Sequence, residues 1–271
     1  MTSAIAPPPA TSRFVPLSRT AHAGKHWKKP SDYRFAASQL VLPLVGIEIS
    51  RAATSLPVVF VRGESGYWPM ALLGVEAGRN LFIDEQGKWL GDYVPTGLRS
   101  QPFALGRGKD EDRTVLCIDE NSALVTDGPG EPLFSEDGQL AAEVRKTAEF
   151  LNRIEQARML TRQACELLER HQCIVPLPFA VKGEEGRDRR LEGLFQAGEE
   201  QLNALPDAAF LELRGSGALQ LAYAQLVSLH KLPLLGALAS WHAGQRNRQA
   251  AAPVDLSVLD RNGTFDFGGL A

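Results

Sequence analysis

The chain has 271 residues, of which 44% are hydrophobic, and a formal net charge of −3 at pH 7. A chain of this length buries enough surface to fold without disulfides or a structural metal. Its near-neutral charge offers no general attraction for nucleic acid or an anionic membrane, so we expect neither as a partner.

Residues 1–30 differ in composition from the rest of the chain. They carry five basic residues and no acidic one, and four prolines lie within the first 16 positions. Such a stretch buries little apolar surface, which predicts a flexible or surface-hugging basic arm. The alternative is an arm that docks on an acidic partner or an anionic ligand.

Residues 31–134 predict a β-rich half. Short apolar runs alternate with Gly, Pro and polar residues, which is typical of an antiparallel meander and not of βαβ units. The clearest hairpin turns are residues 63–66 and 84–87. The expected strands are residues 40–49, 58–61, 68–75, 81–83, 89–94 and 114–118.

Residues 135–244 predict a mainly helical half packed on these strands. From residue 139 to 171, apolar residues recur at every third or fourth position, which predicts one long helix or two with a bend. Further helices are expected to start at Glu199, after Pro206 and near Ser216. Residues 245–271 are rich in Gly, Asn, Gln and Pro and predict a loosely ordered tail. We therefore expect an α+β fold, with an N-terminal antiparallel β-meander or curved sheet followed by a mainly helical C-terminal half.

Familiar catalytic and cofactor motifs do not occur in the sequence. It has no phosphate-binding loop, dinucleotide fingerprint, nucleophile elbow, HExxH or CxxC. His22 with His26, and His171 between Cys165 and Cys173, lack the spacing or the further ligands of a usual metal site. We therefore expect no metal and no cofactor, and we favour a protein without catalytic activity.

Carboxylates at the predicted turns leave an enzyme open as an alternative. Asp84, Glu85 and Asp92 surround one hairpin, and Asp119 with Glu120 follows a strand. Such positions can mount an acid and a base, or a metal, for an enzyme of an unrecognised class. Turn formation explains the same residues more simply.

Aromatic residues flank the two predicted hairpins and form the candidate binding site together with one arginine. The candidates are Tyr67, Trp68, Trp89, Tyr93 and Arg99. Aromatic rings that carry a polar group often line partly hydrated pockets and contact surfaces. Core packing is the alternative interpretation for all four aromatic residues. A guanidinium beside aromatic and proline-rich backbone suits recognition of a carboxylate or a peptide.

The sequence also indicates in which cellular compartment the protein is expected. No apolar run reaches the roughly 18 residues that would span a bilayer, and the N-terminus lacks a cationic region before a continuous apolar one. The three cysteines form no CxxC pair, which favours a reducing environment. We therefore expect a cytoplasmic protein without membrane insertion.

Several runs, taken in order over roughly residues 14–240, resemble the SapC family. They are VPLSRTAHAGKHW, LPVVFVR, MALLGVEAGRNLFIDEQGKWLGDYVP, RSQPFAL, VLCIDENS, GEPLFSEDG and LEGLFQAGEEQLNALPDAAFLELRGSGALQLAYAQLVSL. The family has no established reaction, so the resemblance transfers no catalytic residue.

The resemblance implies an accessory, binding or sensing protein linked to an outer-membrane uptake system that contains TonB-dependent receptors. The expected partner is another protein, and we also consider a small-molecule or peptide ligand and a second copy of the chain. The alternatives are an enzyme of an unrecognised class and a component of surface-layer assembly or export.

Overall fold

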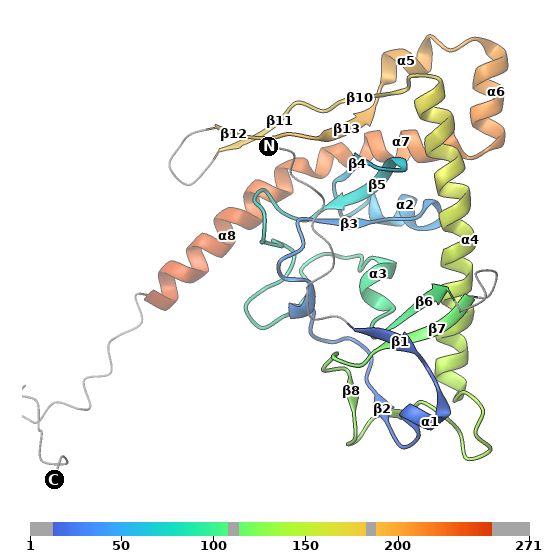
Figure 1. Ribbon diagram of the computed structural model, residues 1–271. Coiled ribbons are helices and arrows are strands. Elements are labelled where there is room, and N and C mark those ends of the chain that lie inside the picture. The colour runs from blue at the N-terminus through green and yellow to red at the C-terminus, as the bar shows by residue number, and fades with distance from the viewer. Residues whose placement is uncertain (1–12, 108–113, 183–187, 251–271) are drawn as a thin grey trace, which may run out of the picture.

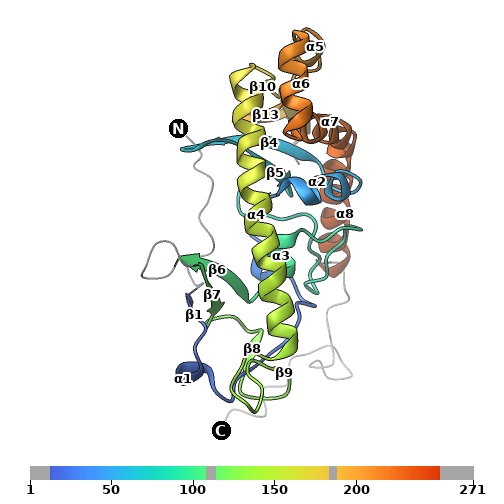
Figure 2. The same ribbon diagram turned by 90° about the vertical axis from the view of Figure 1, so that its right-hand side faces the viewer.

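A computed structural model describes residues 13–107, 114–182 and 188–250 (Figure 1). One helix, α4 (Ala142–Arg170), runs past two sheet-containing regions, and in the rotated view it passes in front of both (Figure 2). The fold is therefore α+β, as expected. Its strands form several small antiparallel sheets, and they come from both halves of the chain.

The main sheet has five strands and combines distant parts of the sequence. Its order is β10 (Ile174–Pro176), β13 (Leu194–Ala197), β4 (Val58–Gly63), β5 (Gly66–Leu72) and β3 (Val41–Pro43). The predicted hairpin between β4 and β5 is confirmed, with Gly63 paired to Gly66 at the turn. Gly66 has a φ of +96°, a conformation that glycine adopts without a steric penalty.

Helices from the C-terminal half pack beside this sheet. They are α5 (Glu199–Asn203), α6 (Asp207–Gly215), α7 (Ala218–Ser228) and α8 (Leu232–Ala250), with a 3₁₀ turn at Leu229–Lys231 before α8. Gln225 of α7 accepts from the Ala197 amide at 2.8 Å and donates to the Val58 carbonyl at 2.9 Å. This buried amide therefore links α7 to two neighbouring strands.

The other elements are short. A hairpin, β11 (Phe179–Lys182) with β12 (Asp188–Leu191), forms a separate two-stranded sheet, and residues 183–187 between its strands lie outside the described residues. The remaining sheets are β1 (Phe14–Pro16), β7 (Thr114–Asp119) and β6 (Phe103–Arg107), and β8 (Val125–Thr126), β2 (His26–Trp27) and β9 (Glu131–Pro132). The short helices are α1 (Arg19–His22), η1 (Arg34–Ala36), α2 (Gly46–Ala52) and α3 (Thr96–Arg99).

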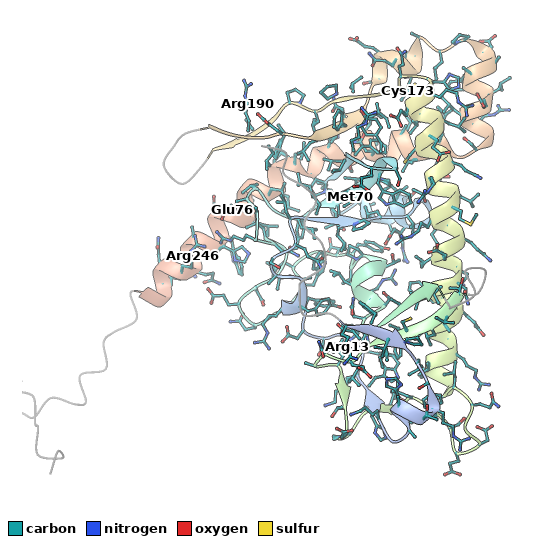
Figure 3. All side chains as sticks on the ribbon, viewed as in Figure 1. Arg13, Met70, Glu76, Cys173, Arg190 and Arg246 are labelled. Atoms are coloured by element: carbon teal, nitrogen blue, oxygen red, sulfur yellow. The ribbon has the colours of Figure 1, made fainter. Side chains whose placement is uncertain are left out.

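The described residues form two hydrophobic cores. The main core lies around the five-stranded sheet, where Figure 3 shows densely packed side chains around Met70. The second core consists of Trp27, Phe103, Ile118, Leu133, Ala141, Val144 and Leu151. α4 contributes to both, with Val144 and Leu151 in the second core and Ala164 and Leu168 in the main one.

Residues 13–30 of the predicted basic arm supply β1, α1 and β2 to the region of the second core. Three of their basic side chains pair with acids of the same chain. These pairs are Arg13 with Glu120 at 3.5 Å, Lys25 with Asp127 at 2.9 Å and Lys29 with Glu143 at 3.1 Å. Residues 1–12 lie outside the described part, and the boundaries at residues 30, 134 and 244 stay predictions.

The strand predicted at residues 40–49 is wrong in its second half, where α2 begins at Gly46. The Glu48 carboxylate accepts a hydrogen bond from the Val45 amide at 3.1 Å, and this bond satisfies a free donor at the start of the helix. Ile49 and Ala52 thus reach the core from a helix, whereas Ile47 of the same helix is exposed.

The strands predicted at residues 81–83 and 89–94 are also wrong, because only an isolated bridge joins Ile83 to Trp89. A few backbone hydrogen bonds, such as that from the Leu90 amide to the Phe82 carbonyl, and several side-chain bonds hold this region without a strand ladder. The Asn80 side chain bonds the Ala36 carbonyl and the Phe82 amide, and the Trp89 indole donates to the Tyr93 carbonyl. The turn at residues 84–87 is confirmed, with the Gly87 amide donating to the Asp84 carbonyl.

The predicted long helix is confirmed as one continuous α4 of 29 residues. Residues 245–250 of the predicted tail belong to α8, and residues 251–271 lie outside the described part. None of the described helices has the length and apolar character that a membrane span requires.

Candidate binding pocket

A pocket lies between the two cores and has a volume of about 250 Å³. We call it the Arg99 pocket, and its lining residues are Trp27, Lys29, Pro30, Tyr33, Arg99, Ser100 and Thr147. The segment from β2 to η1 supplies the first four, the end of α3 the next two and α4 the last. Trp27 belongs to the second core and Tyr33 packs on the main core, so the pocket depends on both.

Arg99 is held by aromatic rings. Its guanidinium carbon lies 5.5 Å from the centre of the Tyr93 ring and 5.5 Å from that of Phe150. One guanidinium nitrogen donates to the Tyr93 hydroxyl at 3.3 Å. A guanidinium carries five N–H donors, and no carboxylate of the described residues forms an ion pair with this one. Arg99 therefore keeps donors available for an external acceptor.

Lys29, the second cation of the pocket, is already paired. Its Nζ lies 3.1 Å from a carboxylate oxygen of Glu143, which also accepts from Lys146 at 2.7 Å. The hydrogen bonds from Lys146 and Lys29 lower the pKa of Glu143, which keeps this carboxyl ionised. Because Glu143 is shared by two lysines, it compensates the charge of Lys29 only in part.

Trp27 forms a wall of the pocket. The side chain is buried, with only 3% of its surface exposed, and its ring packs edge-on against Phe103 at 4.9 Å between centres. Its indole N–H has no hydrogen-bond acceptor among the described residues, and the nitrogen itself is buried. A ligand in the pocket therefore does not reach this donor.

The buried carboxylate of Glu48 is linked to Arg99 through the Tyr93 hydroxyl. Glu48 accepts from the Tyr93 hydroxyl, from the Thr96 amide and from the Thr96 hydroxyl, each at 2.8 Å, and from the Val45 amide. Because the same Tyr93 hydroxyl accepts from Arg99, Glu48 positions the guanidinium through one tyrosine. The network also joins α2 to the start of α3.

Burial and the neighbouring Glu48 raise the pKa of Tyr93, while Arg99 opposes the shift. Tyr93 therefore remains a hydrogen-bond donor at any physiological pH. Burial also raises the pKa of Tyr33, with the Arg99 charge again opposing, so Tyr33 lines the pocket as a neutral phenol.

We expect Tyr93 to be the last of the four tyrosines to ionise in an alkaline titration followed by tyrosinate absorbance. Its raised pKa contributes stability that is complete below the unfolded value of about 10 and declines as the pH rises above it. Tyr93→Phe should remove the last step, whereas the exposed Tyr223→Phe should leave it in place. Ionisation of Tyr93 together with the exposed tyrosines would contradict the Glu48 hydrogen bond.

The structure brings only some of the predicted binding residues together. Tyr93 and Arg99 are in contact, and Trp89 joins them through the bond from its indole to the Tyr93 carbonyl, at 2.9 Å. Tyr67 lies elsewhere, on β5, where its ring packs against Phe195 and under Arg62. Trp68, also on β5, is half-buried, and its indole N–H has no acceptor among the described residues. Of the five candidates, Arg99 alone lines the pocket.

Sequence reasoning missed most of the pocket lining. Trp27 and Lys29 fall in the segment predicted as a basic arm, and Thr147 is a polar residue that the apolar periodicity of α4 does not mark. The separation of Trp27, Arg99 and Thr147 along the chain gives no local pattern. The one available signal was an aromatic residue, Trp27, inside a stretch otherwise poor in apolar residues.

The other candidate sites have local structural roles. Asp84 accepts from the Lys88 amide at 2.7 Å within its turn, and Asp119 accepts from the Arg13 amide at 2.8 Å beside β1. The three cysteines are buried, and burial raises the pKa of Cys165 to about 12. Within the described ranges, no three His, Cys, Asp or Glu side chains are grouped as metal ligands would be.

Comparison with known proteins gives one match. The model of the SapC family matches residues 17–235 of the chain, a range that includes every residue lining the pocket. No curated protein and no solved structure matches the chain.

Proposed function

The chain belongs to the SapC family, and from this premise we propose that it is a non-catalytic binding protein that recognises a carboxylate of its ligand or partner in the Arg99 pocket. The carboxylate completes the hydrogen bonding of Arg99. The pocket lies at the junction of the two cores and is partly open to solvent, so such a group reaches Arg99 directly.

The observation that supports the proposal is that Arg99 keeps hydrogen-bond donors without an acceptor among the described residues. Its guanidinium lies between two rings, with one donor used and no acidic partner among the described residues. Arginine presents parallel N–H groups that match the two oxygens of a carboxylate, and hydrogen bonds between charged groups are the stronger kind. A positioned arginine with free donors at a pocket supports binding of an anion.

The arrangement of the carboxylates supports binding over carboxylate catalysis. Asp84 and Asp119 each accept backbone amides, as acids at turns and strand ends do. Glu48, which is linked to Arg99 through the Tyr93 hydroxyl, has its oxygens occupied by four donors. We therefore rank an enzyme of an unrecognised class as the second candidate function, after the binding protein.

We further propose that the protein works in the cytoplasm as an accessory or sensing component of an outer-membrane uptake system with TonB-dependent receptors. The support is the family resemblance and the lack of a CxxC pair among the cysteines. A surface-layer assembly or export component is the alternative, and it requires the protein to lie outside the cytoplasm.

Native mass spectrometry on protein purified gently from fractionated cells of its own host tests these proposals. We expect the wild type, recovered from the cytoplasmic fraction, to carry a bound ligand or polypeptide that Arg99→Gln loses. Arg62→Gln is the matched control, because Arg62 also lies over a tyrosine ring, at 5.3 Å, but outside the pocket. Equal retention by Arg99→Gln would contradict the binding role, and recovery from the cell envelope would favour the surface-layer alternative.

A further inference from the structure

We propose that the acidic and apolar segment 254–270, which follows α8, docks on a solvent-facing apolar stripe of α7 and α8 in the same chain. We call this surface the α7–α8 stripe, and its residues are Tyr223, Val227, Pro233, Ala237 and Trp241. The stripe shares no residue with the lining of the Arg99 pocket, so the docking is independent of the proposed function.

The stripe lies on helices whose other side is buried. α7, the 3₁₀ turn and α8 follow one another without a loop (Figure 1). Their core-facing side includes the buried residues Leu221, Gln225, Ser228, Leu235 and His242. On the solvent side, Tyr223 and Trp241 are each 41% exposed and Val227 is 63% exposed. Single exposed apolar residues are common, but several along one helical surface are typical of an interaction site.

The charge of this surface favours an acidic occupant. The sequence has no acidic residue between Glu212 and Asp255. Lys231 lies between Val227 and Pro233 in the sequence, and Arg248 lies in the last turn of α8. Neither cation forms an ion pair within the described part of the chain. A second copy of the stripe would bring no acid to these cations, whereas an acidic segment complements them.

Segment 254–270 has the matching composition. It contains three acidic residues, Asp255, Asp260 and Asp266, and one basic residue, Arg261, which gives a net charge of −2. It also contains seven Val, Leu and Phe residues in 17 positions. The segment therefore supplies negative charge for the cations and apolar side chains for the stripe.

The segment is long enough to reach the whole stripe. α8 ends at Ala250, which lies nine residues after Trp241 and 27 after Tyr223, or about 14 and 40 Å along a helix. Seventeen extended residues span about 56 Å. Pro253 disfavours a continued helix and so favours a change of direction. Because the segment is tethered beside the stripe, its effective concentration is in the millimolar range, and a weak intrinsic affinity is sufficient for docking.

Tryptic cleavage after Arg261 tests the docking, because Arg261 is the one Lys or Arg that follows Arg248 in the sequence. We expect this bond in the full chain to be cut at least about tenfold more slowly than in a synthetic peptide of residues 251–271, since the protease acts on the undocked state. The initial rate at which fragment 262–271 appears in mass spectrometry measures the difference. Equal rates in the chain and the peptide overturn the docking.

Two exchanges of an exposed apolar residue for Glu locate the docking site. Val227→Glu places a negative charge on the stripe and should raise the cleavage rate after Arg261 at least about fivefold. Met159→Glu is the matched control, because Met159 is also 63% exposed but lies on α4, and it should leave the rate unchanged. Both positions are exposed, so both variants should unfold in urea like the wild type. An unchanged rate in Val227→Glu overturns the stripe as the docking site.

The indole N–H signal of Trp241 in nuclear magnetic resonance reports on the stripe in the full chain. We expect the double variant Phe265→Ser/Phe267→Ser to move this signal and to speed cleavage after Arg261 about as much as Val227→Glu does. The signal of Trp89, which is buried, should stay in place. Trp241→Phe assigns the signal. An unmoved Trp241 signal overturns the contact between the segment and the stripe.

The remaining outcomes concern a second copy of the chain as the occupant. Docking within one chain predicts that the protection of Arg261 is the same at two protein concentrations about a hundredfold apart. Protection that grows with concentration, together with a dimer that the double variant loses, would mean that the segment docks on another copy and would overturn docking within one chain. A dimer that the double variant keeps and Val227→Glu loses would mean that a second copy covers the stripe, and would overturn the segment as its occupant.

Discussion

Glu48→Ala is expected to lower the free energy of unfolding by about 3 kcal/mol or more, because it leaves several buried donors without an acceptor. The carboxylate is 3% exposed and accepts from Val45, Tyr93 and twice from Thr96. Each unsatisfied buried donor costs about 1 to 3 kcal/mol, and water reaches some of them in the cavity that is left. Urea unfolding at neutral pH measures the difference.

Two variants sharpen this experiment. Glu48→Gln keeps the shape of the side chain but turns one acceptor oxygen into a donor, so it should not restore the wild-type stability. Glu64→Ala, on the exposed β4–β5 turn, should change stability by no more than about 0.5 kcal/mol. A fully stable Glu48→Gln would show that side-chain volume, and not acceptance of hydrogen bonds, is what this position requires.

Trp89→Ala is expected to lower the free energy of unfolding by about 3 to 5 kcal/mol, the usual range for removing a buried large aromatic side chain. Trp89 is 6% exposed, stacks on Phe82 with 5.4 Å between ring centres and contacts Tyr33 at 6.1 Å. Its indole also fixes the backbone at Tyr93. Thermal and urea unfolding should both register the loss.

The control is Trp241→Ala, because Trp241 is 41% exposed on α8. Its removal should cost less than about 1 kcal/mol. If Trp89→Ala left the stability unchanged while abolishing retention of the ligand or polypeptide in native mass spectrometry, Trp89 would be a ligand contact, as first predicted from the sequence, and not a core residue. Loss of binding that follows loss of folding would leave its structural role intact.

Local patterns in the sequence were sufficient to predict some of the elements. The periodicity of α4 and the glycines of the β4–β5 turn both follow from short-range preferences, and both are confirmed. α2 was mistaken for a strand because its start depends on a hydrogen bond from the Val45 amide to Glu48 and on packing against α4 and α7. Tertiary contacts override an ambiguous apolar run of this length.

The candidate site was predictable only in part for a related reason. Arg99 stands out in sequence as a cation among aromatic residues and proline, and it does line the pocket. Trp27 and Thr147 reach the same place from β2 and α4, and only the folded chain brings them there. Strand β13 shows the same limit, because its pairing with β4 of the N-terminal hairpin has no marker in either segment.

The shared helix α4 makes the two cores thermodynamically dependent on each other. Its 29 residues, roughly 43 Å at 1.5 Å for each residue, carry buried side chains for one core near its start and for the other near its end. Melting of either core removes the support of half of this helix and also a wall of the pocket between them. A ligand in that pocket therefore binds only the fully folded chain, and its binding free energy adds to the cooperativity of the whole molecule.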